Sequence, residues 1–127
     1  MSTLIVKNVN LIDGSGSDVQ ENVSVVIKDG KFVKIGSGED DKNAEVIDGQ
    51  GKYMLPGMID THVHLSTEFK PLAERVATPF SYHFYEAAIY AERTINAGIT
   101  TVRDALGSSL GFKQAINDGL ITGPRMQ

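Results

Sequence analysis

Two histidines separated by a single valine are the residues of this chain whose types and spacing best suit metal chemistry. His62 and His64 lie in the stretch GMIDTHVHLS, and the chain has only one other histidine. A β-strand alternates its side chains between two faces, so Asp60, His62 and His64 would share one face. Two imidazoles at positions i and i+2 can reach one ion, with about 2.0–2.1 Å between zinc and each nitrogen. The spacing therefore predicts a metal-binding strand, with a solvated edge strand as the alternative interpretation.

The segment around the histidines favours the metal. Pro56-Gly57 precedes a strand-like run over residues 58–65, and this run opens a series of alternating strands and helices. The face opposite the histidines would pack against covering helices and carries Ile59, Thr61, Val63 and Leu65. Folds of this kind place their chemistry at the carboxyl ends of their strands, where His62 and His64 would lie.

The residues after this strand show a β-α-β-α-β order. A helical stripe at i, i+3, i+4, i+7 and i+11 is formed by Phe84, Ala87, Ala88, Ala91 and Ile95. Thr78-Pro79 fits the start of this helix and Gly98 fits its end. A strand over 99–105, a short helix over 109–118 and the start of a strand at 124–127 follow. This order predicts parallel strands with helical crossovers, and three strands with two helices do not close a barrel.

Residues 1–56 have a different texture, with short strands rich in Val, Ile and Leu. The predicted strands cover residues 4–6, 9–12, 23–28, 32–35, 45–47 and 52–55. Asp29-Gly30 separates two of them and suits the positive φ angles of a two-residue hairpin turn. We therefore predict a mixed β and α/β fold, with a β subdomain over residues 1–57 and an α/β domain over residues 58–127.

Composition excludes several function classes. The chain has 127 residues and a net charge of −4, without a Lys/Arg cluster, which argues against nucleic-acid and acidic-membrane partners. No apolar run is long enough to span a bilayer, and the N-terminus lacks the pattern of a signal peptide. We expect a cytoplasmic protein. Because cysteine is absent, a metal would be held by histidines and carboxylates.

These motifs resemble those of a known group of enzymes. LPGMIDTHVHL resembles the first-strand signature of the amidohydrolase superfamily, metal-dependent hydrolases built on a (β/α)₈ barrel. LIVKNVNLIDGSG, VVIKDGKFVKIG and AEVIDGQGKYMLPG resemble the N-terminal β-segment of that superfamily, which forms part of a small β-sandwich. AERTINAGITTVRDALG and INDGLITGPRM resemble the branch of imidazolonepropionase-like enzymes and Xaa-Pro dipeptidases. The resemblance implies a β-sandwich segment followed by the first βα units of a truncated TIM-like barrel.

The resemblance also implies roles for the histidines. His62 and His64 would ligate the more buried of one or two divalent metals, usually zinc. The other ligands in the superfamily are a carboxylated lysine or glutamate, two further histidines and a late aspartate that moves the proton. We expect none of these within this chain, and therefore no catalytic residue and no activity of the chain alone. Two histidines supply at most half of a zinc shell.

A few further residues are candidates for a supporting role. Asp60 is suited to hold an imidazole in its metal-binding orientation. Arg103 and Asp104 end the second strand of the α/β domain, where they would either line the mouth of the site or tie two loops together. His83 fits a surface or structural role, and Ser66 with Thr67 would follow the ligand strand toward the substrate.

The chain is thus expected to be the N-terminal portion of a metal-dependent amidohydrolase. The complete enzyme would use a metal-activated water to hydrolyse a carbon–nitrogen bond in a small molecule, such as a dipeptide ending in proline or a cyclic amide. A deaminase of the same superfamily is one alternative, and a non-catalytic β-rich scaffold without metal is another. Unpaired strand edges recruit other chains, so we expect a homo-oligomer.

Overall fold

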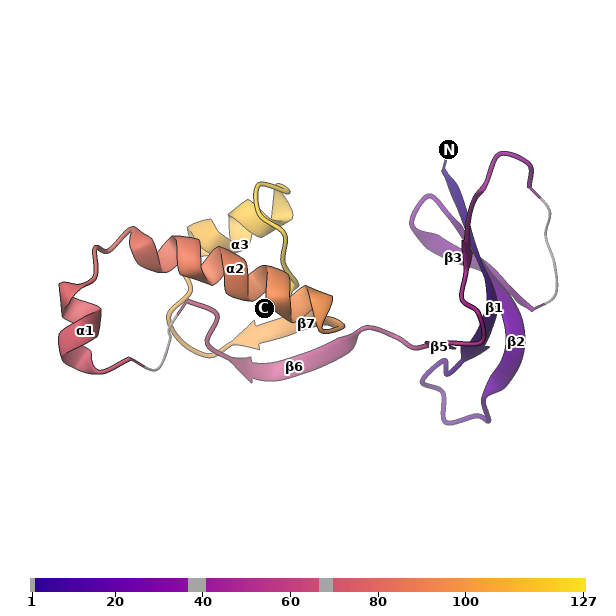
Figure 1. Cartoon of the computed structure of the whole chain (residues 1–127), viewed down its shortest axis with the longest axis horizontal. Helices are drawn as coiled ribbons and strands as arrows, with labels where there is room; N and C mark the ends of the chain where they lie inside the picture. Colours follow the sequence, from indigo (N-terminus) through magenta and orange to yellow (C-terminus); the bar gives the residue numbers. More distant parts are fainter. Residues whose placement is uncertain (1, 37–40, 67–69) are drawn as a thin grey trace. The chain divides into compact units, whose positions relative to one another are not determined.

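The computed structural model describes residues 2–36, 41–66 and 70–127 and divides the chain into two units (Figure 1). The first unit is Met1–Pro56 and the second is Gly57–Gln127. The first contains strands, and the second alternates strands with helices, so the mixed β and α/β class is confirmed. Within the described ranges, no helix is both long enough and apolar enough to cross a membrane.

The first unit is a mixed five-stranded sheet. Its strands are β1 (Thr3–Leu11), β2 (Gln20–Lys28), β3 (Lys31–Gly36), β4 (Glu45–Asp48) and β5 (Tyr53–Met54). The order is β3-β2-β1-β4, and β5 also pairs with β1. The β1–β2 and β2–β3 pairs are antiparallel, whereas β4 and β5 run parallel to β1. Its core is formed by alternate residues of the strands, which lie on one face of the sheet. Val9, Leu11 and Val25 are buried, and Val23 and Ile27 pack against them.

The hairpin between β2 and β3 turns at the predicted dipeptide. Lys28 pairs with Lys31, and the two residues between them, Asp29 and Gly30, have φ angles of 49° and 76°. Positive φ at both central positions defines a type I′ turn, whose twist matches that of the strands. The prediction of a hairpin at Asp29-Gly30 is confirmed.

Asn8 marks an irregularity within β1. The sequence pattern predicts separate strands over residues 4–6 and 9–12, but the structure joins them in one strand. Asn8 has a φ of 54°, and the pairing of β1 with β2 shifts its register between Val6 and Val9. A β-bulge has this effect. Asn8 therefore marks an irregularity within one strand and does not separate two strands.

A tight turn after β4 is bonded to this bulge. The Asp48 carboxylate accepts hydrogen bonds from the backbone N–H of Gln50 at 2.9 Å and from Nδ2 of Asn8 at 3.0 Å. The bond from Gln50, followed by that from Asn8, holds the pKa of Asp48 below its usual value, because both donors favour the ionised carboxylate. The N–H of Gly49 donates to the carbonyl of Lys7 at 2.7 Å. The turn backbone therefore lies directly against β1.

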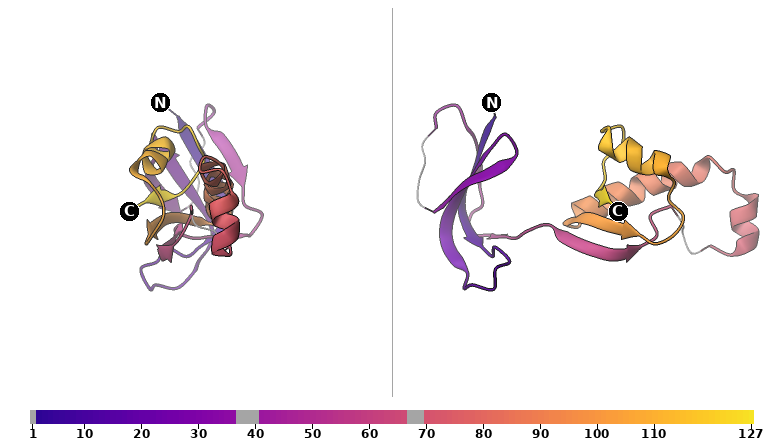
Figure 2. Two further views of the ribbon diagram at one scale, coloured as in Figure 1. Left: turned by 90° about the vertical axis from the view of Figure 1, so that its left-hand side faces the viewer. Right: turned by 180° about the vertical axis from the view of Figure 1, so that it is seen from behind.

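The second unit is a three-stranded parallel sheet with helical crossovers. In chain order it contains β6 (Met58–Val63), α1 (Leu72–Ala77), α2 (Tyr82–Asn96), β7 (Ile99–Asp104), α3 (Leu110–Asn117) and β8 (Arg125–Met126). The strand order is β6-β7-β8, and both pairs are parallel. The helices α2 and α3 lie on the same face of this sheet, as the views from the front and from behind both show (Figures 1 and 2).

One apolar cluster joins these helices to the strands. It consists of buried residues from the segment after β6 and from α2, β7, α3 and β8: Leu65, Ala87, Ala91, Val102, Phe112 and Met126. Ala87 and Ala91 are both fully buried, and a Cβ placed on Gly123 would lie 2.9 Å from that of Ala91. Small residues on α2 thus allow the segment before β8 to approach the helix closely.

The helical pattern differs from the prediction at its start. Thr78-Pro79 was expected to begin the long helix, but Thr78 caps the end of α1 and donates through Oγ1 to the carbonyl of Glu74 at 2.8 Å. The helix α2 begins at Tyr82, whose N–H donates to the carbonyl of Pro79. The short helix α1 buries no residue, and its six residues are fewer than the roughly 11 over which a helical spacing such as that of Leu72 and Val76 is read from a sequence. Gly98 ends α2 as predicted, with a φ of 88°.

Two glycine substitutions should separate backbone strain from steric overlap in the first unit. A Cβ at Gly30 would meet nothing within 4 Å, whereas a Cβ at Gly49 would overlap Cγ1 of Val9. Gly30→Ala should therefore lower the free energy of unfolding by about 1 kcal/mol, the cost of a left-handed residue with a side chain. Gly49→Ala should cost about 2–3 kcal/mol, as overpacking of a core does. Urea unfolding followed by circular dichroism measures both, and equal losses would contradict this distinction.

Candidate metal centre

The two histidines of the HVH segment lie together at the carboxyl end of β6. His62 is within the strand and exposed, and His64 directly follows the strand and is half-buried. Their ring centres are 5.1 Å apart and the ring planes are at 87° to each other. A tetrahedral ion about 2 Å from one nitrogen of each ring would place the two ring centres about 5 Å apart. The separation therefore fits two imidazoles that share one ion.

The described residues place no third candidate ligand beside the two histidines. Within residues 2–36, 41–66 and 70–127, no group of three or more His, Cys, Asp or Glu side chains is placed to hold a metal ion. A zinc shell needs about four ligands, so the pair accounts for half of one. The donor set that is present, two imidazole nitrogens, is one that zinc accepts readily.

The apolar side of β6 is packed only near its carboxyl end. Leu65 is 5% exposed in the core cluster and Val63 packs against that cluster, as the alternation of the strand predicts. Ile59, which was expected to pack in the same way, is 69% exposed. The prediction is wrong for Ile59 and also for Thr61, which is exposed. Ile59 pairs with Thr101 and not with the buried Val102, which pairs with Asp60. The register between β6 and β7 also shifts between Asp60 and Val63, which breaks strict alternation.

The segment that carries His64 is fixed on both sides. The carbonyl of Val63 accepts a hydrogen bond from the N–H of Ala105 at 2.9 Å. The N–H of Leu65 donates to Oδ2 of Asp104 at 3.0 Å. A buried side chain and two bonds to the end of β7 thus hold the backbone on which the His64 ring is mounted. Rigid support of this kind is what a metal ligand requires.

Asp60 bonds the backbone of the strand. Its Oδ1 accepts a hydrogen bond from the N–H of His62 at 3.0 Å. The carboxylate therefore supports the peptide unit that carries the first histidine. The role of Asp60 as a partner of an imidazole ring stays a prediction.

Arg103 and Asp104 both connect β7 with the β6 segment. The guanidinium of Arg103 donates to the carbonyl of Thr61 at 3.3 Å. The carboxylate of Asp104 accepts from the N–H groups of Leu65 and Leu106, each at 3.0 Å. These bonds agree with the interpretation that the two residues tie neighbouring segments together. A role at the mouth of the site stays a prediction for both.

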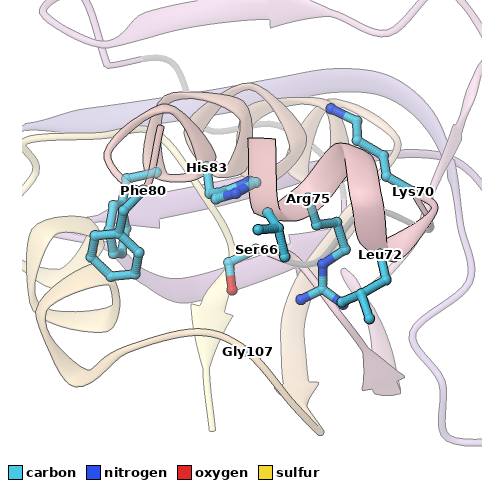
Figure 3. A pocket seen from close by; sticks show the side chains of 9 residues that line it. Ser66, Lys70, Leu72, Arg75, Phe80, His83 and Gly107 are labelled. Atoms are coloured by element: carbon cyan, nitrogen blue, oxygen red, sulfur yellow. The ribbon is translucent and has the colours of Figure 1, made fainter. Parts of the chain in front are cut away.

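A cavity opens beside the end of the histidine segment. Its volume is about 370 Å³, and its lining is Ser66, Lys70, Leu72, Arg75, Val76, Phe80, His83, Phe84 and Gly107. Figure 3 shows Ser66 between the side chains of His83 and Arg75. Three basic residues surround this cavity, and two of them, His83 and Lys70, lie at 3.7 Å and 2.6 Å from the Glu86 carboxylate. The contact with Glu86 agrees with a structural role for His83.

Sequence reasoning missed part of this cavity. Lys70 and Arg75 belong to the segment around α1, whose six residues are too few for the spacing of Leu72 and Val76 to predict a helix. Ser66 was expected near the substrate and lines the cavity. Its partner in that expectation, Thr67, lies outside the described residues.

Known proteins share both the sequence and the fold of the chain. A model of the amidohydrolase family matches residues 53–127. An N-acetylglucosamine-6-phosphate deacetylase of Lysinibacillus sphaericus is 36% identical over 66 residues, which are 52% of this chain and 16% of that protein. An adenine deaminase of Clostridium perfringens is 39% identical over 66 residues, which are 50% of this chain and 11% of that protein.

A solved structure matches nearly the whole chain. A prolidase complexed with N-methylphosphonate-L-proline superposes with a TM-score of 0.88 at 29% identity, over 98% of this chain and 31% of that chain. The chain spans between 11% and 31% of the lengths of these three proteins. The family match includes the whole second unit and with it both histidines. The chain belongs to the amidohydrolase family.

Proposed function

We propose that the chain forms the metal-binding start of an enzyme that hydrolyses a carbon–nitrogen bond in a small molecule. The observation that carries the proposal is the pair of imidazole rings 5.1 Å apart at the carboxyl end of a parallel strand. The relatives of the chain are hydrolases that act on such bonds, a dihydroorotase and a D-hydantoinase among them. The three parallel strands would be the first of a (β/α)₈ barrel, and the first unit would be part of a β-sandwich.

In this proposal His62 and His64 hold a divalent ion, for which zinc suits the two nitrogen donors. When bound, the ion supplies the activation of water that hydrolysis requires. The chain itself contributes the rigid placement of both rings, through the Asp60 bond to the backbone N–H of His62 and the buried Leu65 after His64. The remaining ligands and the proton-transferring group would come from parts of the enzyme beyond these 127 residues.

The cavity beside the histidine segment supports a substrate with a negatively charged group. Lys70, Arg75 and His83 line it together with Ser66, and Lys70 and His83 both lie near the Glu86 carboxylate. A guanidinium such as that of Arg75 recognises a carboxylate through paired N–H donors. The free carboxylate of a dipeptide ending in proline is one group that it would bind.

A deaminase is the second candidate, because the adenine deaminase match favours it. The two activities release different products from different substrates. Ammonia released from an aminopurine would support the deaminase, whereas two amino acids released from a dipeptide, or a ring-opened acid formed from a cyclic amide, would support the amide hydrolase.

The first prediction of this proposal concerns the metal. In the enzyme that contains these residues, His62→Ala and His64→Ala should each remove most of the bound metal and the activity with it, because each removes a ligand from a rigid strand. Metal content by plasma mass spectrometry and hydrolysis assays measure the two effects. His83→Ala is the matched control, since His83 lies beside Glu86 on α2, and it should keep the metal.

Two outcomes would contradict the assignment. If His62→Ala keeps its full complement of metal, the ring of His62 is not a ligand. If the unaltered enzyme carries no stoichiometric metal, the chain is a scaffold without the proposed chemistry.

The cavity yields a prediction about substrate affinity. Arg75→Ala should raise KM for a dipeptide substrate by about 10-fold, the loss expected for one charge-assisted hydrogen-bonded contact, while kcat changes less. A matched amide substrate without the carboxylate should show no such rise. Equal effects on both substrates would contradict recognition of a carboxylate by Arg75.

The sheet of the second unit supports association between copies of the chain. β6 is at the edge of the order β6-β7-β8 among the described strands, and its residues Met58 and Ile59 are 56% and 69% exposed. Exposed apolar edge strands pair with other chains. We therefore expect the 127-residue chain to self-associate in sedimentation velocity, and Ile59→Lys to weaken that association. A stable monomer at high concentration would contradict this expectation.

A further inference from the structure

We propose that Asp104 is a positioning residue for His64, which it controls through the backbone of Leu106. The role of this arrangement in metal binding rests on the proposed function, whereas its effect on the His64 ring does not. Asp104 ends β7, and the hydrogen bonds of its side chain within the described residues go to Leu65, Leu106 and Ser108 and not to either histidine. Its influence on the ring passes through one peptide unit.

The carboxylate of Asp104 joins two segments that follow neighbouring parallel strands. Oδ2 accepts hydrogen bonds from the N–H of Leu65 at 3.0 Å and from Oγ of Ser108 at 2.6 Å. Oδ1 accepts a hydrogen bond from the N–H of Leu106 at 3.0 Å. The first of these donors follows β6, and the other two belong to the loop after β7. Ser108 is also bonded to Ser66 at 3.1 Å, so the two loops are joined at a second point.

Leu106 connects this carboxylate to the His64 ring. Its N–H donates to Asp104, and its carbonyl oxygen lies 3.2 Å from Nδ1 of His64. A carbonyl oxygen only accepts, so this contact is a hydrogen bond only when Nδ1 carries the proton. In a neutral imidazole with a proton on Nδ1, the lone pair is on Nε2. The loop held by Asp104 therefore presents Nε2 of His64 as the free ligand atom.

Two of the three hydrogen bonds of Asp104 fix groups next to the His64 ring. Leu65, bonded to Oδ2, is the residue directly after His64, and it is anchored in the core at 5% exposure. Leu106, bonded to Oδ1, supplies the acceptor for the ring itself. One carboxylate thus fixes the backbone that carries the ring and also the group that selects its tautomer. Partners that orient a ligating histidine in this way typically change metal affinity 10–100-fold when removed.

The test measures the tautomer of His64 in the metal-free protein, where it is independent of any metal centre. Nitrogen-15 correlation spectra of the 127-residue chain at about pH 8, above the usual histidine pKa, distinguish a protonated from an unprotonated ring nitrogen. In the unaltered chain, His64 should carry its proton on Nδ1. Asp104→Asn keeps the size of the side chain but has one acceptor oxygen, which the two donors Leu65 and Ser108 should retain, so that its NH2 group faces the N–H of Leu106. The Leu106 peptide is then no longer held, and the Nε2–H form of His64 should gain population.

A second measurement reads metal affinity in the enzyme that contains these residues. Asp104→Asn should weaken zinc binding about 10–100-fold. Asp118→Asn is the matched control, because Asp118 is another carboxylate of the second unit and accepts a hydrogen bond from Gln114 at the end of α3. It should change neither the tautomer nor the affinity. If Asp104 only stabilised the fold, Asp104→Asn would lower the melting temperature of the protein without changing the tautomer of His64.

Three results would overturn the inference. They are a proton on Nε2 of His64 in the unaltered chain, an unchanged tautomer in a folded Asp104→Asn, and a tautomer change of the same size in Asp118→Asn. If Asp104→Asn does not fold, Ser108→Ala removes the 2.6 Å bond to Asp104 and the 3.1 Å bond to Ser66. It should shift the tautomer in the same direction by a smaller amount. An unchanged tautomer in Ser108→Ala would then overturn the inference.

Discussion

The parallel pairing of β6 with β7 is the constraint on which the rest of the second unit depends. Parallel neighbours cannot be joined by a short turn, so α2 must cross over between them, and its buried alanines must fit against β7. The same pairing brings the carboxyl ends of both strands to one edge, where Val63 pairs with Asp104. A site at this edge is therefore built from residues about 40 positions apart in the chain that no local motif connects.

Much of this arrangement is predictable from the sequence, because the responsible signals are local or periodic. The type I′ turn needs positive φ at two successive residues, and Asp29-Gly30 is a pair that tolerates it. The buried face of α2 follows from the spacing of Ala87 and Ala91, and the end of the helix follows from Gly98. The placement of His62 and His64 on one face requires only a strand and an interval of two residues.

Other features are beyond such reasoning for physical reasons. The helix α1 has six residues, so the spacing of Leu72 and Val76 covers little more than one turn and is too short to predict a helix. The exposure of Ile59 follows from its pairing with Thr101 and not with the buried Val102, and alternation along one strand does not reveal this register. The bulge at Asn8 and the register shift in β6 are decided by pairing with a partner strand. For Arg103 and Asp104 the sequence allows two roles, at the mouth of the site or in a link between two segments. The link is supported only by the hydrogen bonds of the folded chain.

The link from Leu106 to His64 runs through a peptide group, and this has a consequence for variation among sequences. Neither the N–H nor the carbonyl depends on the side chain, which at Leu106 is 67% exposed. Most other residues could therefore replace Leu106 while the contact persists, although proline would remove the N–H that donates to Asp104. An engineer who redesigns this loop can vary the identity of the residue at 106 but must preserve its backbone path. The type of residue at such a position would vary among related sequences, because selection acts on the backbone geometry and not on the side chain.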